Sequence, residues 1–204
     1  MEIRMVFGEN ALKSRTILIP QRNRAIFLDR DGVINRAVVR NGKPHSPANV
    51  AEMEILPGVP EALHRLHAAG FLLIVVTNQP NVSRGIQTRA SIEAIHTALR
   101  AALPLSDIRV CYHDDADGCR CRKPAAGMLL DATRDEGIDL STSFMVGDRW
   151  RDIEAGRRAG CKTVFIDYDY AEPKPVDFDF KAASLAASVE WILSHSGKKE
   201  IPLL

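Results

Sequence analysis

Two aspartates separated by one residue follow an apolar run in the segment Ala25 to Gly32, AIFLDRDG. The apolar residues predict a buried strand, so that Asp29 and Asp31 lie at its carboxyl end, the edge of an open α/β sheet where ligands bind. Two carboxylates at this spacing can share one cation, while one acts as a nucleophile and the other transfers protons. Taken alone, the pattern also fits a turn in which glycine follows an ordinary strand.

Three later segments place polar residues after predicted strands in the same way. They are Thr77 and Asn78 after residues 71–76, Arg122 and Lys123 after 108–112, and Asp148 with Asp152 after 143–146. Each segment alone also fits a structural role, as a turn cap, a solvated helix entry or a helix N-cap with an exposed first turn. Together with the two aspartates they supply what hydrolysis of a phosphate ester requires: a nucleophile, a proton donor, contacts to the phosphoryl oxygens and a metal held by carboxylates.

The set predicts a phosphomonoester hydrolase with a covalent intermediate. Asp29 would attack phosphorus, and Asp31 would protonate the leaving alcohol and then accept a proton from water. The Thr77 hydroxyl and a backbone N–H would hold the phosphoryl group, Lys123 would neutralise negative charge, and Asp148 would complete a Mg²⁺ site of oxygen ligands. The candidates for substrate contact are Thr77, Asn78, Arg122 and Arg149.

The elements that must position these residues alternate between strand and helix. Strands are predicted at 25–28, 71–76, 108–112, 143–146 and 162–166, and helices at 59–70, 88–103, 125–137, 150–160 and 185–193. This alternation with short connections is typical of a doubly wound parallel α/β sheet. Asn41-Gly42 predicts a hairpin that forms a small flap beside the acids. We expect residues 1–23 to form an N-terminal arm, with a short strand at Thr16–Ile19, and residues 24–204 to form a single domain.

The composition of the 204 residues, 46% hydrophobic and 26% charged, is typical of a soluble globular protein. A formal net charge of +1 gives no indication of nucleic-acid or membrane binding. No apolar run approaches the roughly 20 residues of a membrane span, and the first residues lack the pattern of a secretory signal. Crowded cysteines favour metal binding in a reducing compartment over a disulfide framework, so a cytoplasmic protein is expected.

A second metal site is predicted in the loop that follows residues 108–112. Three thiols and one imidazole occur together there, from Cys111, His113, Cys119 and Cys121. A Cys₃His set is a common structural zinc site, and four protein ligands leave no position for water. The alternatives are a loop that merely contains cysteines, or a disulfide that involves Cys111. Zinc would fix Arg122 and Lys123 beside the phosphate, whereas Cys161 is expected to be a buried core residue.

Four motifs in this order resemble those of the haloacid-dehalogenase-like phosphohydrolases: DRDG at 29–32, TNQ at 77–79, RKP at 122–124 and GDRWRD at 147–152. DRDGVIN, TNQ followed by RG, and CRKP are similar to the small-cap group of heptose-bisphosphate and histidinol-phosphate phosphatases. The resemblance implies a Rossmann-like core with a minimal cap, Mg²⁺ as the catalytic metal and the roles given above. It further implies that the backbone carbonyl of Asp31 binds Mg²⁺ with Asp29 and Asp148, and it supports the same four residues as zinc ligands.

The leading hypothesis is therefore a Mg²⁺-dependent phosphatase of a small phosphorylated metabolite, with removal of the 7-phosphate of D-glycero-D-manno-heptose 1,7-bisphosphate as the first choice. The alternatives are histidinol phosphate or another sugar phosphate. A hypothesis of another class is a catalytically silent, zinc-stabilised binding domain, although Asp29, Asp31, Lys123 and Asp148 are all present. A phosphatase of nucleic-acid ends is disfavoured by the near-neutral charge. The sequence does not indicate an oligomeric state.

Overall fold

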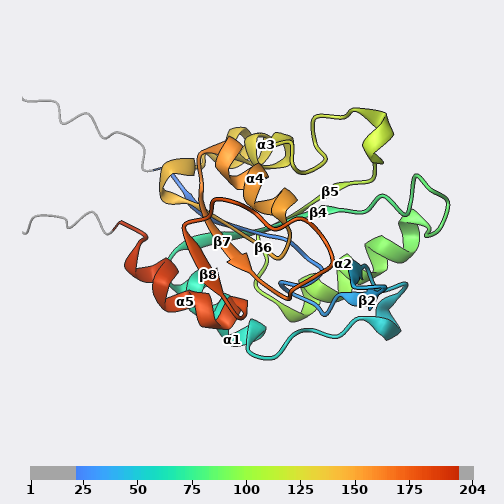
Figure 1. Ribbon diagram of the computed structural model, residues 1–204. Coiled ribbons are helices and arrows are strands. Elements are labelled where there is room, and N and C mark those ends of the chain that lie inside the picture. The colour runs from blue at the N-terminus through green and yellow to red at the C-terminus, as the bar shows by residue number, and fades with distance from the viewer. Residues whose placement is uncertain (1–21, 198–204) are drawn as a thin grey trace, which may run out of the picture.

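The computed structural model describes residues 22–197, in which strands and helices alternate (Figure 1). The strands are β1 (Arg24–Leu28), β2 (Val38–Arg40), β3 (Lys43–His45), β4 (Phe71–Asn78), β5 (Asp107–Cys111), β6 (Phe144–Gly147), β7 (Lys162–Ile166) and β8 (Phe180–Ala182). The helices are α1 (Val59–Ala68), α2 (Arg89–Ala102), α3 (Gly127–Glu136), α4 (Trp150–Ala159) and α5 (Leu185–Ser194). All five predicted helices are therefore present, with boundaries within a few residues of those expected.

A parallel sheet in the order β5-β4-β1-β6-β7-β8 forms the centre of the described part of the chain. Its inner strand β1 pairs with two neighbours, so that Leu28 lies opposite Val75 of β4 and Val146 of β6. The chain runs outward from β1 to one side through β4 and β5, and to the other through β6, β7 and β8. Such a reversal of strand order opens a crevice at the carboxyl ends of the strands. The predicted doubly wound parallel sheet is confirmed.

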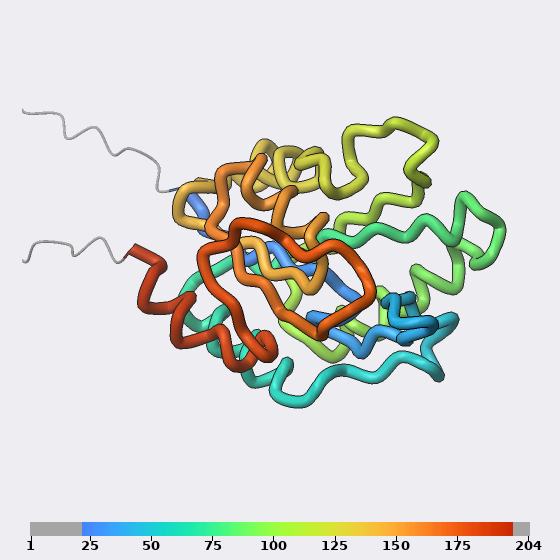
Figure 2. Tube along the Cα trace, in the orientation of Figure 1, coloured from blue at the N-terminus to red at the C-terminus, as the bar shows by residue number. Residues whose placement is uncertain are grey.

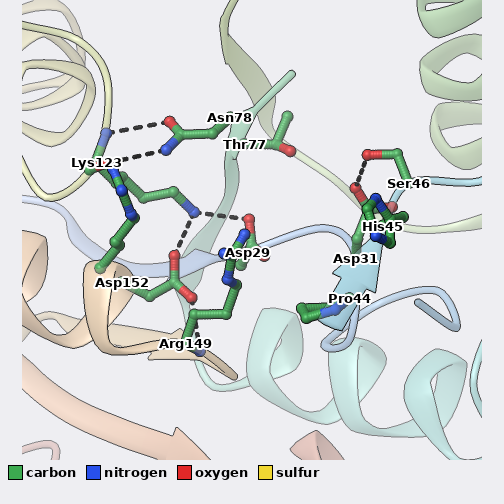
Figure 3. Close-up of a pocket in the computed structure, with 11 residues that line it drawn as sticks. Asp29, Asp31, Pro44, His45, Ser46, Thr77, Asn78, Lys123, Arg149 and Asp152 are labelled. Carbon is green, nitrogen blue, oxygen red and sulfur yellow. Dashed lines mark hydrogen bonds and ion pairs between the residues drawn. The ribbon is translucent and has the colours of Figure 1, made fainter. Parts of the chain in front are cut away.

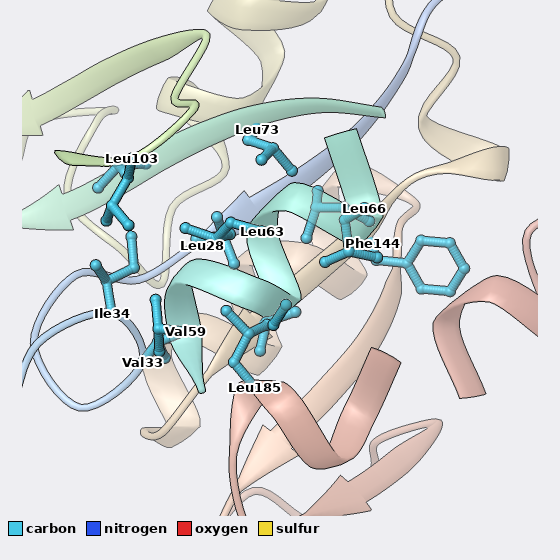
Figure 4. Packing of buried hydrophobic residues seen from close by; sticks show 14 of the residues in the cluster. Leu28, Val33, Ile34, Val59, Leu63, Leu66, Leu73, Leu103, Phe144 and Leu185 are labelled. Atoms are coloured by element: carbon cyan, nitrogen blue, oxygen red, sulfur yellow. The ribbon is translucent and has the colours of Figure 1, made fainter. Parts of the chain in front are cut away.

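Helices cover both faces of this sheet (Figure 1). On β1, Ala25 and Phe27 pack with buried residues of α3 and α4, whereas Ile26 and Leu28 pack with those of α1, α2 and α5. Figure 4 shows the second of these clusters, in which α1 lies close to Leu28 of β1. Successive side chains of a strand point to opposite faces, and here both faces are buried, which explains why the strand sequence is continuously apolar.

The flap is a two-stranded antiparallel sheet of its own, formed by β2 and β3. Its turn residues Asn41 and Gly42 have φ angles of 53° and 73°, as a two-residue hairpin turn requires. The segment between β7 and β8, orange in Figure 2, loops out from the sheet. It reaches the flap, where the Ala171 N–H donates a hydrogen bond of 2.8 Å to the Gly42 carbonyl. The predicted hairpin is confirmed, and it is braced by the segment that follows β7.

Two parts of the chain differ from the sequence-based expectation or lie beyond it. The edge strand β8 pairs with β7, with Ile166 opposite Ala182. It was not predicted, because its three residues are too few to show the hydrophobic pattern of a strand. The strand β4 continues through Thr77 and Asn78, because both still pair with β5. The predicted arm, including its strand at Thr16–Ile19, lies outside the described residues except for residues 22 and 23.

Close packing of α4 on the sheet makes a stability prediction. A Cβ atom at Gly156 would lie 2.5 Å from Cβ of Met145 on β6. On an exposed helix, alanine would be favoured over glycine by about 1 kcal/mol, but overpacking a core costs about 1–3 kcal/mol. At 2.5 Å the overpacking cost lies at the upper end of this range, so we expect Gly156→Ala to lower the free energy of unfolding by about 2 kcal/mol in urea denaturation. The control Arg158→Ala, on the exposed face of the same helix, should change it by less than about 0.5 kcal/mol. Equal stability of Gly156→Ala and the unmodified protein would contradict the prediction.

Candidate active site

Residues from four strand ends and the flap line one pocket at the carboxyl edge of the sheet (Figure 3). The lining residues are Asp29, Asp31, Pro44, His45, Ser46, Thr77, Asn78, Lys123, Arg149, Arg151 and Asp152. Asp29 follows β1 directly, Thr77 and Asn78 end β4, and Lys123 comes from the loop after β5. The structure thus brings together most of the residues that the sequence singled out.

A buried group of three charges connects these elements. The Nζ atom of Lys123 lies 2.7 Å from Oδ1 of Asp29 and 2.6 Å from Oδ1 of Asp152. Burial alone would lower the pKa of the Lys123 amine, but the carboxylates of Asp152 and Asp29 outweigh it and hold that pKa above its ordinary value. Lys123 is therefore cationic beside the predicted nucleophile. Asp152 was expected beside Asp148 at this strand end but was assigned no role, and its burial rules out the exposed helical turn that was the alternative for this segment.

The main chain of Lys123 is fixed by Asn78. The Asn78 amide nitrogen donates a hydrogen bond of 3.0 Å to the Lys123 carbonyl, and the Lys123 N–H donates one of 3.1 Å to the Asn78 amide oxygen. These two bonds join the end of β4 to the loop after β5. Asn78, predicted as a substrate contact, therefore also positions the lysine.

The predicted nucleophile lies in an environment that opposes its charge. Burial raises the pKa of the Asp29 carboxyl to about 6, although the adjacent Lys123 amine acts in the opposite direction. Its main-chain N–H continues the ladder of β1, donating a hydrogen bond of 2.9 Å to the Val146 carbonyl. A cation bound next to Asp29 would favour the carboxylate form, since an opposite charge stabilises it.

The side chain of Asp148 has the features of a metal ligand. Both of its carboxylate oxygens are buried, and neither has a hydrogen-bond partner among the described residues. Burial and the nearby charges of Asp29 and Asp152 raise its pKa well above the ordinary value, although the nearby Tyr170 hydroxyl acts in the opposite direction. Carboxylate oxygens of Asp29, Asp148 and Asp152 all lie within 4.8 Å of one another. Buried carboxylates are normally paired or bound to a metal, so this oxygen-rich cluster fits Mg²⁺.

Asp31 is held by a different set of partners. Arg30 donates two hydrogen bonds to its carboxylate, from Nε at 3.1 Å and from Nη2 at 3.0 Å. Asn35 and Ser46 donate further bonds at 2.9 Å and 2.7 Å. Burial would raise the pKa of Asp31, but Arg30 and these donors hold it below the ordinary value. The sequence analysis missed Arg30, whose only signal was its position between two acids.

Gln79 joins the two halves of the pocket and was also not predicted as a site residue. Its side chain is fully buried, and its amide nitrogen donates hydrogen bonds to Oγ1 of Thr77 at 2.8 Å and to Oδ2 of Asp31 at 3.0 Å. Because the Thr77 oxygen accepts this bond, its own hydrogen is left to donate to a ligand. The structure therefore supports Thr77 as a hydroxyl donor inside the pocket.

The arginines in and near the pocket are each paired with an acid. Arg149, predicted as a substrate contact, lines the pocket and forms a bidentate ion pair with Glu172 from the segment after β7. Arg151 was not predicted; it lines the pocket and binds Asp115 at 2.7 Å. Arg122 is nearly buried and binds Asp115 at 2.8 Å, so its guanidinium faces the cysteine loop (residues 111–123) and not the pocket.

The predicted zinc ligands converge within the cysteine loop. The ligand atoms of Cys111, His113, Cys119 and Cys121 lie within 4.8 Å of one another, with the sulfur atoms 3.3 to 3.6 Å apart. Sulfur atoms of a tetrahedral zinc site, at about 2.3 Å from the metal, lie roughly 3.8 Å apart, so the donor set fits zinc. All four cysteines of the chain are free thiols, which removes the disulfide alternative. Cys161 is buried away from this cluster, as predicted.

In the described part of the chain, no helix is both long and apolar enough to cross a membrane.

The chain is similar in sequence to proteins of one kind. The HAD-hydrolase-like family model matches residues 120–191. A D-glycero-D-manno-heptose-1,7-bisphosphate 7-phosphatase of Thermosynechococcus vestitus is 32% identical over 194 residues, which cover 84% of this chain and 96% of that protein. The D-glycero-beta-D-manno-heptose-1,7-bisphosphate 7-phosphatase of Bordetella bronchiseptica is 39% identical over 144 residues, 67% of this chain and 76% of that protein.

A solved structure agrees with these relatives. The crystal structure of the D,D-heptose 1,7-bisphosphate phosphatase of B. bronchiseptica, in complex with magnesium and phosphate, superposes with a TM-score of 0.69 and 31% sequence identity. The match covers 84% of this chain and 98% of that one. The chain therefore belongs to the HAD-like hydrolase family, and is a phosphatase of the group that includes the heptose 1,7-bisphosphate 7-phosphatases.

Proposed function

We propose that this phosphatase removes the 7-phosphate of D-glycero-D-manno-heptose 1,7-bisphosphate through an aspartyl-phosphate intermediate on Asp29, with Mg²⁺ as its metal. The observation that carries the proposal is the buried amine of Lys123 between Asp29 and Asp152, beside the unpartnered carboxylate of Asp148. A carboxylate nucleophile, a fixed cation and an oxygen-rich metal site are the parts that phosphoryl transfer through aspartate needs. The names of the relatives support the heptose bisphosphate as the substrate.

The reaction proceeds in two steps. In the first, an oxygen of Asp29 attacks phosphorus, the bond from phosphorus to the ester oxygen breaks, and that oxygen takes a proton from Asp31 and leaves as the alcohol. Because Arg30 and the other donors hold the pKa of Asp31 below its ordinary value, its carboxyl must take up this proton as the substrate binds, before the first step. In the second, water attacks the phosphorus of the aspartyl phosphate and gives a proton to Asp31. The bond from phosphorus to Asp29 then breaks, which restores the carboxylate and releases inorganic phosphate. Each step uses Asp31 in the opposite protonation state.

The transferred phosphoryl group would be held by groups that the fold already positions. The Thr77 hydroxyl donates to one oxygen, and the Lys123 amine neutralises another while it remains paired with Asp29. The carboxylates of Asp29 and Asp148 and the main-chain carbonyl of Asp31 would hold the metal. Bound Mg²⁺ supplies positive charge that stabilises the phosphoryl oxygens. Arg149 and the flap residues Pro44 and His45 lie at the pocket wall, where they can contact the leaving group.

The cysteine loop is proposed to hold a structural zinc ion through Cys111, His113, Cys119 and Cys121. The loop ends at Lys123, and Asp115 within it binds Arg122 and Arg151, so its shape determines where these three cations lie. Zinc with four protein ligands has no open position and acts through folding of the loop. Free thiols of this kind persist in a reducing compartment, which supports a cytoplasmic location.

The substrate is tested by phosphate release from a panel of esters with Mg²⁺ and with a chelator. The panel contains heptose 1,7-bisphosphate, other sugar phosphates, histidinol phosphate and short oligonucleotides phosphorylated at the 3′ or 5′ end. We expect the highest kcat/KM with the heptose bisphosphate, loss of activity with the chelator, and retention of the 1-phosphate in the product by ³¹P NMR. A preference for another ester would contradict the proposed substrate but not the proposed mechanism. No release from any ester by metal-loaded protein would favour a binding domain.

Removal of the nucleophile tests the covalent mechanism. Asparagine has the shape of aspartate but does not attack phosphorus, so Asp29→Asn should lower kcat by about 10⁴-fold or more. The circular dichroism spectrum should be unchanged. Asp177→Asn, an exposed acid that pairs with Arg157 far from the pocket, is the control and should keep full activity. Turnover by Asp29→Asn within a factor of ten of the unmodified protein would exclude Asp29 as the nucleophile.

The zinc proposal is tested by metal analysis. Substitution of both Cys119 and Cys121 by serine removes two of four ligands, so the purified protein should lose its zinc and show a lower Tm. Cys161→Ser is the matched control, because it replaces a buried cysteine outside the cluster. It should lower the Tm by a packing defect while its zinc content stays at about one per chain. Unchanged zinc in the double variant would show that the loop does not bind zinc.

A further inference from the structure

Arg30 is a fully buried arginine that the catalytic roles above do not use. It lies between Asp29 and Asp31 in the sequence, and its side chain has no exposed surface. Two of its nitrogens, Nε and Nη2, donate hydrogen bonds to the Asp31 carboxylate. A bidentate pair of this kind fixes the plane of the carboxylate as well as its distance. The orientation of Asp31 therefore depends on where the Arg30 guanidinium is held.

The remaining terminal nitrogen of Arg30 is held by a histidine from another element. Nη1 lies 3.0 Å from Nε2 of His96, which comes from α2, 66 positions further along the chain. A guanidinium has only donors, so Nε2 must accept and the imidazole proton lies on Nδ1. Burial and the Arg30 charge lower the pKa of His96 to about 4, which keeps the ring neutral and able to accept. His96 has no exposed surface.

His96 is itself connected to the cysteine loop. Its Nδ1 atom lies 3.5 Å from Oε1 of Glu93, one helical turn earlier on α2, but makes no hydrogen bond of good geometry to any described residue. The same Glu93 oxygen accepts a hydrogen bond from the Tyr112 hydroxyl. Tyr112 stands between Cys111 and His113, two of the proposed zinc ligands. A chain of polar contacts thus runs from the cysteine loop through α2 to Asp31.

We propose that His96 is a positioning residue for Asp31, acting through Arg30. The neutral imidazole of His96 supplies the one acceptor that Nη1 of Arg30 has among the described residues. It therefore fixes the position of the guanidinium, which in turn orients the carboxylate of Asp31. This inference rests on the proposed role of Asp31. Without the acceptor, a buried donor of Arg30 is left unpaired and the guanidinium turns away. Asp31 keeps its bonds to Asn35, Ser46 and Gln79, so that the effect is partial.

A pair of substitutions separates loss of the acceptor from loss of the ring. His96→Leu fills the site but has no acceptor. His96→Gln places an amide oxygen near the position of Nε2 and keeps one. Each variant is assayed as full-length, metal-loaded protein with two esters, heptose 1,7-bisphosphate and p-nitrophenyl phosphate. The alcohol of the first needs a proton from Asp31 to leave, whereas p-nitrophenolate leaves without one, so the ratio of the two kcat/KM values reports proton donation.

We expect His96→Leu to lower kcat/KM for the heptose bisphosphate by about 10- to 100-fold, with little change for p-nitrophenyl phosphate. His96→Gln should restore the ratio to within about threefold of the unmodified protein. A variant that is partly unfolded loses both activities in proportion and leaves the ratio unchanged. The ratio therefore distinguishes positioning of the acid from a general structural role.

An unchanged ratio in His96→Leu would overturn the inference, as would a ratio that falls equally in His96→Gln. Asp31→Asn gives the limit for complete loss of the acid. If that variant keeps the ratio of the unmodified protein, the proposed role of Asp31 fails and the inference fails with it. If the unmodified protein hydrolyses p-nitrophenyl phosphate but not the heptose bisphosphate, only the proposed substrate fails. The ratio is then measured with the sugar phosphate that the panel shows to be hydrolysed fastest.

Discussion

The buried amine of Lys123 between Asp29 and Asp152 is the interaction on which the site depends. Moving three charged groups out of water is unfavourable unless each is paired, and here one cation serves two carboxylates that come from β1 and α4. Removal of the amine would leave two acids facing each other in a dry pocket. The arrangement needs the ends of β1, β4, β5 and β6 at one edge, and the doubly wound sheet places them there.

Much of the fold and the reacting groups could be predicted, because their signals are local. Continuous apolar strands, glycine and proline at helix ends, and an acid after a strand each lie within a few residues. Asp29, Thr77, Lys123 and Asp148 were predicted to meet because the carboxyl ends of parallel strands share one edge. Their predicted roles remain proposals. The proposed zinc ligands could also be predicted from a local signal, because all four lie in one short loop.

The residues that orient the reacting groups were missed because their role depends on contacts across the fold. Nothing in the sequence near Arg30 indicates that His96 of α2 lies 3.0 Å from it. Gln79 and Asp152 are polar residues of ordinary type, and only their contacts in the folded chain show what they bind. The same holds in the cysteine loop, where Asp115 pairs with both Arg122 and Arg151. The spacing of these residues in the sequence does not indicate that they pair. Sequence patterns therefore predict the reacting groups of such a site better than the residues that orient them.

The flap has a consequence for how this enzyme could change over evolution. Within residues 22–197, β2 and β3 pair with each other and with no further strand, and the Ala171 N–H donates a main-chain hydrogen bond to Gly42. The strands of the flap contain none of the core residues that pack around β1. Loops of this kind accept insertion and replacement with little effect on the scaffold. A different hairpin at this position could therefore select a different leaving group while the catalytic residues at the sheet edge stay the same. Substrate specificity and catalytic chemistry can then evolve separately.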